Sequence, residues 1–177
     1  YGGKYFGEIP LFYALKNSLN SATANLGLAV GLGNIAEVAR MLGVRSPLQT
    51  LPSMTLGSFE LYPSEVLTTY MTFANMGVQK ETSFIREIYN HDGQQLYAFK
   101  SQGSEFIDPA ATASLVSMMK QTVQSGTARS IVLNCFIHPA AGKTGTTSDN
   151  KDAWFAGFTR YSTTITWVGY DNNLSHG

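Results

Sequence analysis

The chain has 177 residues, and its 12 Lys and Arg balance its 12 Asp and Glu, so its formal net charge is zero. A nucleic-acid-binding surface needs an excess of basic residues to neutralise phosphates, so this composition argues against such a partner. With 44% hydrophobic and 12% aromatic residues the chain can bury a core, which excludes an acidic disordered segment. The longest nearly apolar stretch, Leu26–Leu32, is much shorter than the roughly 20 residues that a membrane-spanning helix needs. We therefore expect no membrane contact by this chain.

The first part of the chain, residues 1–130, is predicted to be mainly helical. Its start, Tyr-Gly-Gly-Lys, has neither Met nor a signal peptide, so we expect a piece of a longer protein. Helices are predicted over 11–19, 22–30, 33–42, 63–76 and about 109–124, with Pro near several starts and Gly after several ends. Between the last two, Asp92-Gly93 separates two strand-like runs and predicts a β-hairpin over 84–99.

The second part, residues 131–177, is predicted to form antiparallel strands. Three short runs, 140–147, 153–159 and 163–170, are separated by turns that are too short for a helical crossover. The third run alternates with a period of two, which is typical of a strand. The whole pattern predicts an α+β fold in which helices pack on an antiparallel sheet.

The segment Gly142-Lys143-Thr144-Gly145-Thr146 in the first of these strands is the strongest local signal. Thr144 and Thr146 are two residues apart, so their side chains leave the same face of the strand. Gly145 has no side chain, so the backbone of a ligand can approach closely. This arrangement suits a carboxylate and an amide that lie along the strand. The alternative is a solvated turn at a strand end, because three-residue strings recur by chance.

A second signal, Ser18-Leu19-Asn20, lies at the break between two predicted helices. Ser and Asn at helix ends are usually capping residues, and a capping role alone would explain the presence of either residue here. With Lys143-Thr144-Gly145 further along the chain, however, the pair resembles the second and third motifs of the penicilloyl-serine transferases, S-x-N and K-T-G.

The sequence around both motifs is similar to that of class A, bifunctional penicillin-binding proteins. The similarity covers Tyr1–Val30 (YGGKYFGEIPLFYALKNSLNSATANLGLAV) and Leu56–Val78 (LGSFELYPSEVLTTYMTFANMGV). It continues through Gly126–Arg129 and Ala141–Gly157 (AGKTGTTSDNKDAWFAG). Essentially the whole chain therefore resembles the C-terminal part of their transpeptidase domain.

The resemblance implies a role for each matched residue. Ser18 would relay a proton between the active-site base and the attacking or leaving amine. Asn20 would hydrogen-bond the side-chain amide of the acyl donor and help to orient that base. Lys143 would hold Ser18 and add positive potential, so Ser18, Asn20 and Lys143 should meet at one cleft. Thr144 and Thr146 would donate to the substrate carboxylate, and the Thr146 N–H would form half of an oxyanion hole.

The resemblance also implies a fold and a reaction. The family fold has a five-stranded antiparallel sheet with helices on both sides, and this chain would supply its last three strands. The reaction is acyl transfer from a D-Ala-D-Ala stem peptide through an acyl-serine, with β-lactams acylating the same serine and no cofactor. Partners would be stem peptides, β-lactams and the rest of the transpeptidase domain. The parent would lie on the periplasmic side of the bacterial inner membrane, anchored by an N-terminal segment, usually with a glycosyltransferase domain upstream.

The family's nucleophile motif, S-x-x-K, is missing from its expected place. It precedes the second motif by some tens of residues, and none occurs in the 17 residues before Ser18. Two S-x-x-K strings lie elsewhere: Ser117–Lys120 falls in a predicted helix after the second motif, and Ser148–Lys151 in a turn after the third. We expect neither to be catalytic and the chain alone to be inactive. The alternative is a non-catalytic module that binds peptidoglycan or β-lactams.

The remaining reactive side chains give no further site. His91, His138 and His176 are dispersed and, with one cysteine, show no metal-ligand spacing, so we expect no metal. Cys135 lies in an apolar run and is predicted to be a small buried hydrophobe. Trp154 and Trp167 are predicted to pack within the core or on a sheet face, and the alternative for Trp154 is that it lines the cleft.

Overall fold

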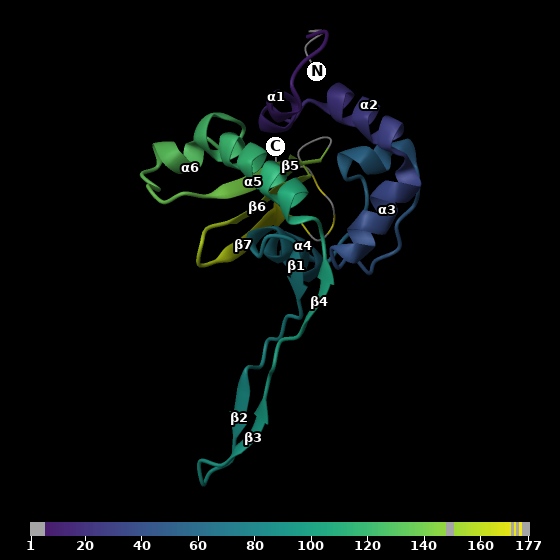
Figure 1. The fold of residues 1–177 in the computed structure, drawn as a ribbon. Coiled ribbons are helices and arrows are strands. Elements are labelled where there is room, and N and C mark those ends of the chain that lie inside the picture. Colours follow the sequence, from purple (N-terminus) through teal and green to yellow (C-terminus); the bar gives the residue numbers. More distant parts are fainter. Residues whose placement is uncertain (1–5, 148–150, 171, 173, 175–177) are drawn as a thin grey trace.

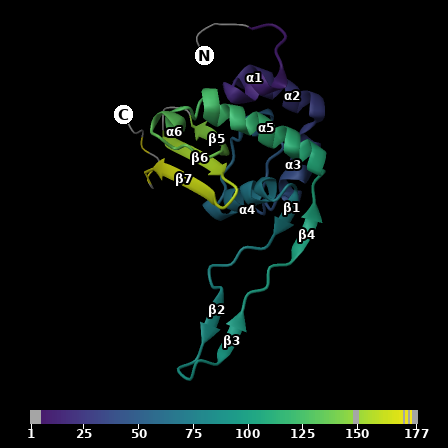
Figure 2. The ribbon, with the colours of Figure 1, turned by 60° about the vertical axis from the view of Figure 1, so that its left-hand side comes forward.

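The computed structural model describes residues 6–147, 151–170, 172 and 174 (Figures 1 and 2). Its first elements are α1 (Leu11–Lys16), α2 (Asn20–Val30), α3 (Leu32–Met41), the 3-10 helix η1 (Pro52–Leu56) and α4 (Pro63–Ala74). They are followed by β1 (Val78–Lys80), β2 (Glu87–Tyr89), β3 (Gln95–Ala98), β4 (Gly103–Phe106), α5 (Pro109–Ser125), α6 (Ser130–Leu133), β5 (Ala141–Thr146), β6 (Asp152–Phe158) and β7 (Thr163–Gly169). The predicted α+β class is confirmed. In the part of the chain described, no helix is long and apolar enough to span a bilayer.

A three-stranded antiparallel sheet in the order β5-β6-β7 forms the C-terminal part of the molecule, as predicted. Ala141 of β5 lies opposite Phe158 of β6, and both side chains are buried against Met119 of α5. Helix α5 packs on β5, and α4 packs on β6 and β7 (Figure 1). The half-buried side chains around this core come from α1, α4 and α5: Leu15, Tyr70, Phe73, Ala74, Leu115 and Val116. Burying each large apolar side chain contributes about 1.5–3 kcal/mol, so this cluster fixes the helices on the sheet.

The start of α4 is fixed by the carboxylate of Glu65, which is only 8% exposed. Its Oε1 accepts hydrogen bonds from the backbone N–H groups of Arg45 (2.7 Å) and Ser46 (2.6 Å). Its Oε2 accepts from the Ser46 hydroxyl (2.7 Å) and from the backbone N–H of Tyr62 (2.9 Å). Burial alone would raise the pKa of Glu65, but the Ser46 hydroxyl and the three N–H groups outweigh it and lower the pKa from 4.5 to about 2. Glu65 therefore ties the loop after α3 to the first turn of α4.

Residues 81–102 form a long hairpin, here called the arm, which projects away from the helices and the sheet (Figures 1 and 2). At its base β1 pairs with β4, and further out β2 pairs with β3, both antiparallel. The predicted turn at Asp92-Gly93 is confirmed: Gly93 has φ +79°, and the Asn90 side-chain oxygen accepts from the N–H groups of Asp92 and Gln94. Strands β1 and β4 at the base of the arm were not predicted, because strands of three or four residues are too short to show an alternating pattern.

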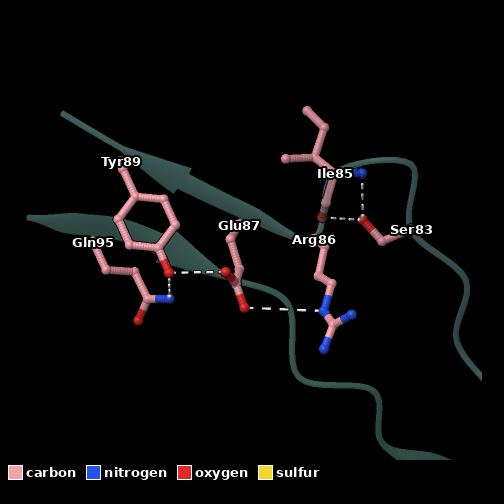
Figure 3. Close-up of polar contacts among 6 residues, drawn as sticks. All are labelled: Ser83, Ile85, Arg86, Glu87, Tyr89 and Gln95. Carbon is pink, nitrogen blue, oxygen red and sulfur yellow. Dashed lines mark hydrogen bonds and ion pairs between the residues drawn. The ribbon is translucent and has the colours of Figure 1, made fainter. Parts of the chain in front are cut away.

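The polar contacts between side chains within the arm are exposed to solvent. Figure 3 shows the Tyr89 hydroxyl donating to Glu87 (2.8 Å) and accepting from the Gln95 side-chain amide (3.1 Å). Arg86 lies 3.9 Å from the same Glu87 carboxylate. The hydrogen bond to Glu87 raises the pKa of Tyr89. Exposed pairs of this kind contribute little to stability. The arm also exposes apolar side chains: Phe84, Ile85, Ile88, Leu96 and Tyr97.

One prediction for residues 131–140 is wrong. Helix α6 extends to Leu133, and β5 begins at Ala141, one residue after the predicted start of this strand. Cys135 is exposed and has φ +65°, whereas its apolar surroundings predicted a buried side chain. The left-handed backbone at Cys135 turns the chain out of α6 at the surface, so neighbours such as Ile137, which is 86% exposed, also remain outside the core. Apolar content alone did not distinguish this surface turn from a buried strand.

Candidate active site

The break between α1 and α2 presents Ser18 at the surface. Helix α1 ends at Lys16, and Ser18 has φ +54°, a left-handed conformation that costs a residue other than glycine roughly 1–3 kcal/mol. Backbone hydrogen bonds from Ser18 to Leu15 (3.2 Å) and from Leu19 to Ala14 (3.0 Å) hold this turn. The helix restarts at Asn20, two residues earlier than predicted. The surrounding structure thus fixes a strained serine in one position.

Lys143 of β5 reaches this serine. Its Nζ donates to the Ser18 hydroxyl (2.9 Å) and to the carbonyl oxygen of Thr144 (2.8 Å), across 125 positions of sequence between Lys143 and Ser18. The contact between Lys143 and Ser18 that the resemblance implied is therefore present. Burial lowers the pKa of Lys143, because a charged ammonium loses hydration in a partly buried site. The ammonium places positive potential beside the serine hydroxyl and the end of the strand.

The remainder of the K-T-G segment lies along an open strand edge. Among the described strands, β5 pairs on one side only, with β6, and its other edge bears no strand. Thr146 is exposed opposite Ala153, and Gly145 lies opposite Trp154. The Trp154 and Trp167 rings approach within 6.3 Å between centroids on the sheet face, consistent with the packing role predicted for them. Among the described strands this edge of β5 is therefore unpaired, and Thr146 is exposed at its end.

A turn after α5 connects the two motif-bearing segments. The backbone N–H of Thr127 donates to the carbonyl oxygen of Lys16 at the end of α1 (3.2 Å). The Thr127 hydroxyl lies 2.7 Å from the Thr144 hydroxyl. Sequence reasoning assigned Thr127 no role, because it lies outside the three motifs and its contacts are with residues distant in sequence. The local signals were the helix-ending Gly126 and the family resemblance of Gly126–Arg129, and neither gives Thr127 a role.

Gly126→Ala is expected to disturb this connection. A Cβ at Gly126 would collide with the Lys16 carbonyl oxygen and lie 2.8 Å from Thr122 Cα, so backbone has to move. We expect a loss of about 1–3 kcal/mol in stability, because the displaced segment leads directly to Ser18. Thermal unfolding of the protein measures this loss.

Gly33→Ala is the matched control, because a Cβ there meets nothing within 4 Å. Because Gly33 lies in helix α3, this substitution should leave the stability unchanged or slightly raise it. Equal behaviour of the two variants would contradict the importance of the Gly126 contact.

The other predicted residues lie as follows. Asn20 is exposed in the first turn of α2, and among the described residues it makes no hydrogen bond to Ser18 or Lys143. Ser117 and Lys120 are exposed on α5. Residues 148–150 of the second S-x-x-K string lie outside the described residues. No group of three or more potential metal ligands occurs in the described part of the chain.

The chain belongs to the transpeptidase domain family of class A penicillin-binding proteins: the family described as "Penicillin binding protein transpeptidase domain" matches residues 3–175. Penicillin-binding protein 1B of Vibrio cholerae is 38% identical over 174 residues, which cover 98% of this chain and 22% of that protein. Penicillin-binding protein 1A of Aquifex aeolicus is 38% identical over 178 residues, which cover 100% of this chain and 24% of that protein. The chain thus spans less than a quarter of the length of these two relatives.

Solved structures share the fold. The crystal structure of penicillin-binding protein 1A from Haemophilus influenzae matches with a TM-score of 0.88 at 23% identity, over 96% of this chain and 31% of that chain. PonA1 from Mycobacterium tuberculosis in complex with penicillin V matches with a TM-score of 0.82 at 23% identity, over 97% of this chain and 50% of that chain. The arrangement of helices and antiparallel strands is therefore that of penicillin-binding transpeptidase domains.

Proposed function

We propose that this chain supplies the second and third motifs of a peptidoglycan D,D-transpeptidase, whose nucleophilic serine and its lysine come from outside the chain. The observation that carries the proposal is the 2.9 Å hydrogen bond from Lys143 Nζ to the Ser18 hydroxyl, beside an open strand edge. A hydroxyl held by an ammonium is suited to passing a proton, because the cation stabilises the oxygen whenever negative charge develops on it. The substrate class is a D-Ala-D-Ala stem peptide.

Each residue of the site has a role in this reaction. Ser18 carries the proton between the active-site base and the departing or attacking amine, and Lys143 keeps its hydroxyl in position. Thr144 and Thr146 donate to the terminal carboxylate of the donor peptide, while the Thr146 N–H stabilises the oxyanion of the tetrahedral intermediate. Asn20, exposed at the start of α2, binds the side-chain amide of the donor once substrate is present. β-Lactams acylate the nucleophilic serine outside this chain, because they reproduce the shape and charge of the donor.

The setting of the site follows from the same proposal. The parent protein lies on the periplasmic side of the bacterial inner membrane, anchored through an N-terminal segment, and has a glycosyltransferase domain. Its partners are stem peptides and β-lactams. The names of the relatives and the penicillin V complex of PonA1 support this setting.

Covalent labelling with a fluorescent penicillin tests the proposal. The full-length protein that contains this chain is expected to keep the label after denaturation in detergent, because an acyl-serine is a covalent bond. The 177-residue chain, checked for folding by circular dichroism, is expected to remain unlabelled. Labelling of the chain alone would place the nucleophile within it. An unlabelled full-length protein that binds stem peptide reversibly and saturably would favour the non-catalytic module instead.

A further inference from the structure

We propose that Thr127 is a positioning residue that directs the Thr144 hydroxyl toward the carboxylate of the acyl donor, an inference that rests on the function proposed above. The observation is the 2.7 Å contact between the two hydroxyl oxygens. At this distance one hydroxyl donates to the other, and either can be the donor.

The backbone of Thr127 is held from both sides, so its hydroxyl projects from a fixed position. Its N–H donates to the Lys16 carbonyl oxygen (3.2 Å). The next residue, Ala128, is buried and its N–H donates to the carbonyl oxygen of Thr122 (3.1 Å). Thr127 itself is exposed, and its hydroxyl contacts that of Thr144. Thus Thr127 joins the end of α1 to β5 without being part of the buried core.

The direction of the hydrogen bond decides what Thr144 can do. A threonine hydroxyl has one proton to donate and two lone pairs to accept. When Thr127 donates to Thr144, the Thr144 proton is free for an anion at the strand edge. The polarised pair then forms a chain from Thr127 through Thr144 to the carboxylate, which strengthens both bonds. Among the described residues, Thr127 is the only side chain that hydrogen-bonds the Thr144 hydroxyl.

Acylation rates of the full-length protein with benzylpenicillin and with its uncharged methyl ester, followed by intact mass, test this role. Thr127→Val removes the hydroxyl and keeps the branched shape. We expect it to slow acylation by benzylpenicillin about five- to tenfold, the effect of losing one hydrogen bond between neutral groups. Acylation by the ester should change much less, because the carboxylate is absent. Thr127→Ser, which restores the hydroxyl, should recover most of the rate.

Thr164→Val is the matched control, since Thr164 is exposed on β7. It should leave both rates unchanged. Equal slowing of benzylpenicillin and its ester by Thr127→Val would indicate a merely structural role and overturn the inference. An unchanged rate with benzylpenicillin would overturn it as well. Failure of the unaltered protein to be acylated would instead contradict the proposed function itself.

Discussion

Replacing Lys143 with Ala in the full-length protein is expected to slow acylation by benzylpenicillin by about a hundredfold or more. The ammonium donates to the Ser18 hydroxyl and to the Thr144 carbonyl oxygen, so its removal releases the serine and the strand end together. Removing a group that stabilises developing charge or positions a proton carrier typically costs about 10²–10³ in rate. The rate of formation of the acylated protein, followed by intact mass, measures the effect.

Lys120→Ala is the matched control for this substitution. Lys120 belongs to an S-x-x-K string, but it is exposed on α5, and we expect its removal to leave the acylation rate within about twofold, as for surface changes away from a site. A Lys120→Ala variant as slow as Lys143→Ala would reverse the assignment of the two lysines. A Lys143→Ala variant that is acylated as fast as the unaltered protein would contradict the assignment of Lys143 to the site.

Glu65→Gln is expected to have the largest effect on local stability. The amide can still accept hydrogen bonds through its oxygen, but its NH₂ group cannot accept from the Ser46 hydroxyl and the Tyr62 N–H. Both hydrogen bonds are partly buried, so the loss of each acceptor costs up to roughly 1–3 kcal/mol. We expect the N–H groups of Arg45 and Ser46 to exchange with deuterium about a hundredfold faster in the variant, measured by mass spectrometry of peptides spanning residues 44–65. Glu60→Gln, at an exposed position nearby, should leave their exchange unchanged.

The same carboxylate makes this region sensitive to acid. The pKa of Glu65 is about 2 in the folded protein against an ordinary 4.5, so the folded state favours the charged form. Its contribution, about 3 kcal/mol by linkage, is complete above pH 4.5 and is lost as the pH falls from 4.5 toward 2. The difference in deuterium exchange rate of the Arg45 and Ser46 N–H groups between the unaltered protein and Glu65→Gln should therefore become smaller as the pH falls from 4.5 toward 2. A difference that is the same at pH 6 and pH 3 would contradict the origin of the low pKa.

The sequence predicts those elements whose ends carry a turn-forming or helix-capping residue. The arm turns at Asp92-Gly93 because glycine accepts a positive φ, and α5 begins after Asp108, whose carboxylate accepts from the N–H groups of Ala110 and Ala111. The period of two in the last strand and the short turns before it predict the antiparallel sheet. The meeting of Ser18 and Lys143 was predicted from family resemblance, since no local pattern connects residues 125 positions apart.

What the sequence does not predict depends on packing between distant segments. From the sequence, Glu65 is an ordinary acidic residue in the first turn of a helix. The four hydrogen bonds that its carboxylate accepts form only because the loop after α3 packs beside it. Thr127 follows a helix-ending glycine, and its partner Thr144 is brought near by the packing of α5 on β5. Cys135 was misjudged because an apolar run predicts burial only where the chain enters the core.

The arm has a mechanical consequence. It is attached to the rest of the molecule through the short pairing of β1 with β4, and the sheet that carries Lys143 is a separate one. Residues added in opposed pairs along the arm would therefore move its tip outward by about 3.3 Å for each pair, while every distance around Ser18 stays the same. The length of the arm can therefore change independently of the contact between Ser18 and Lys143.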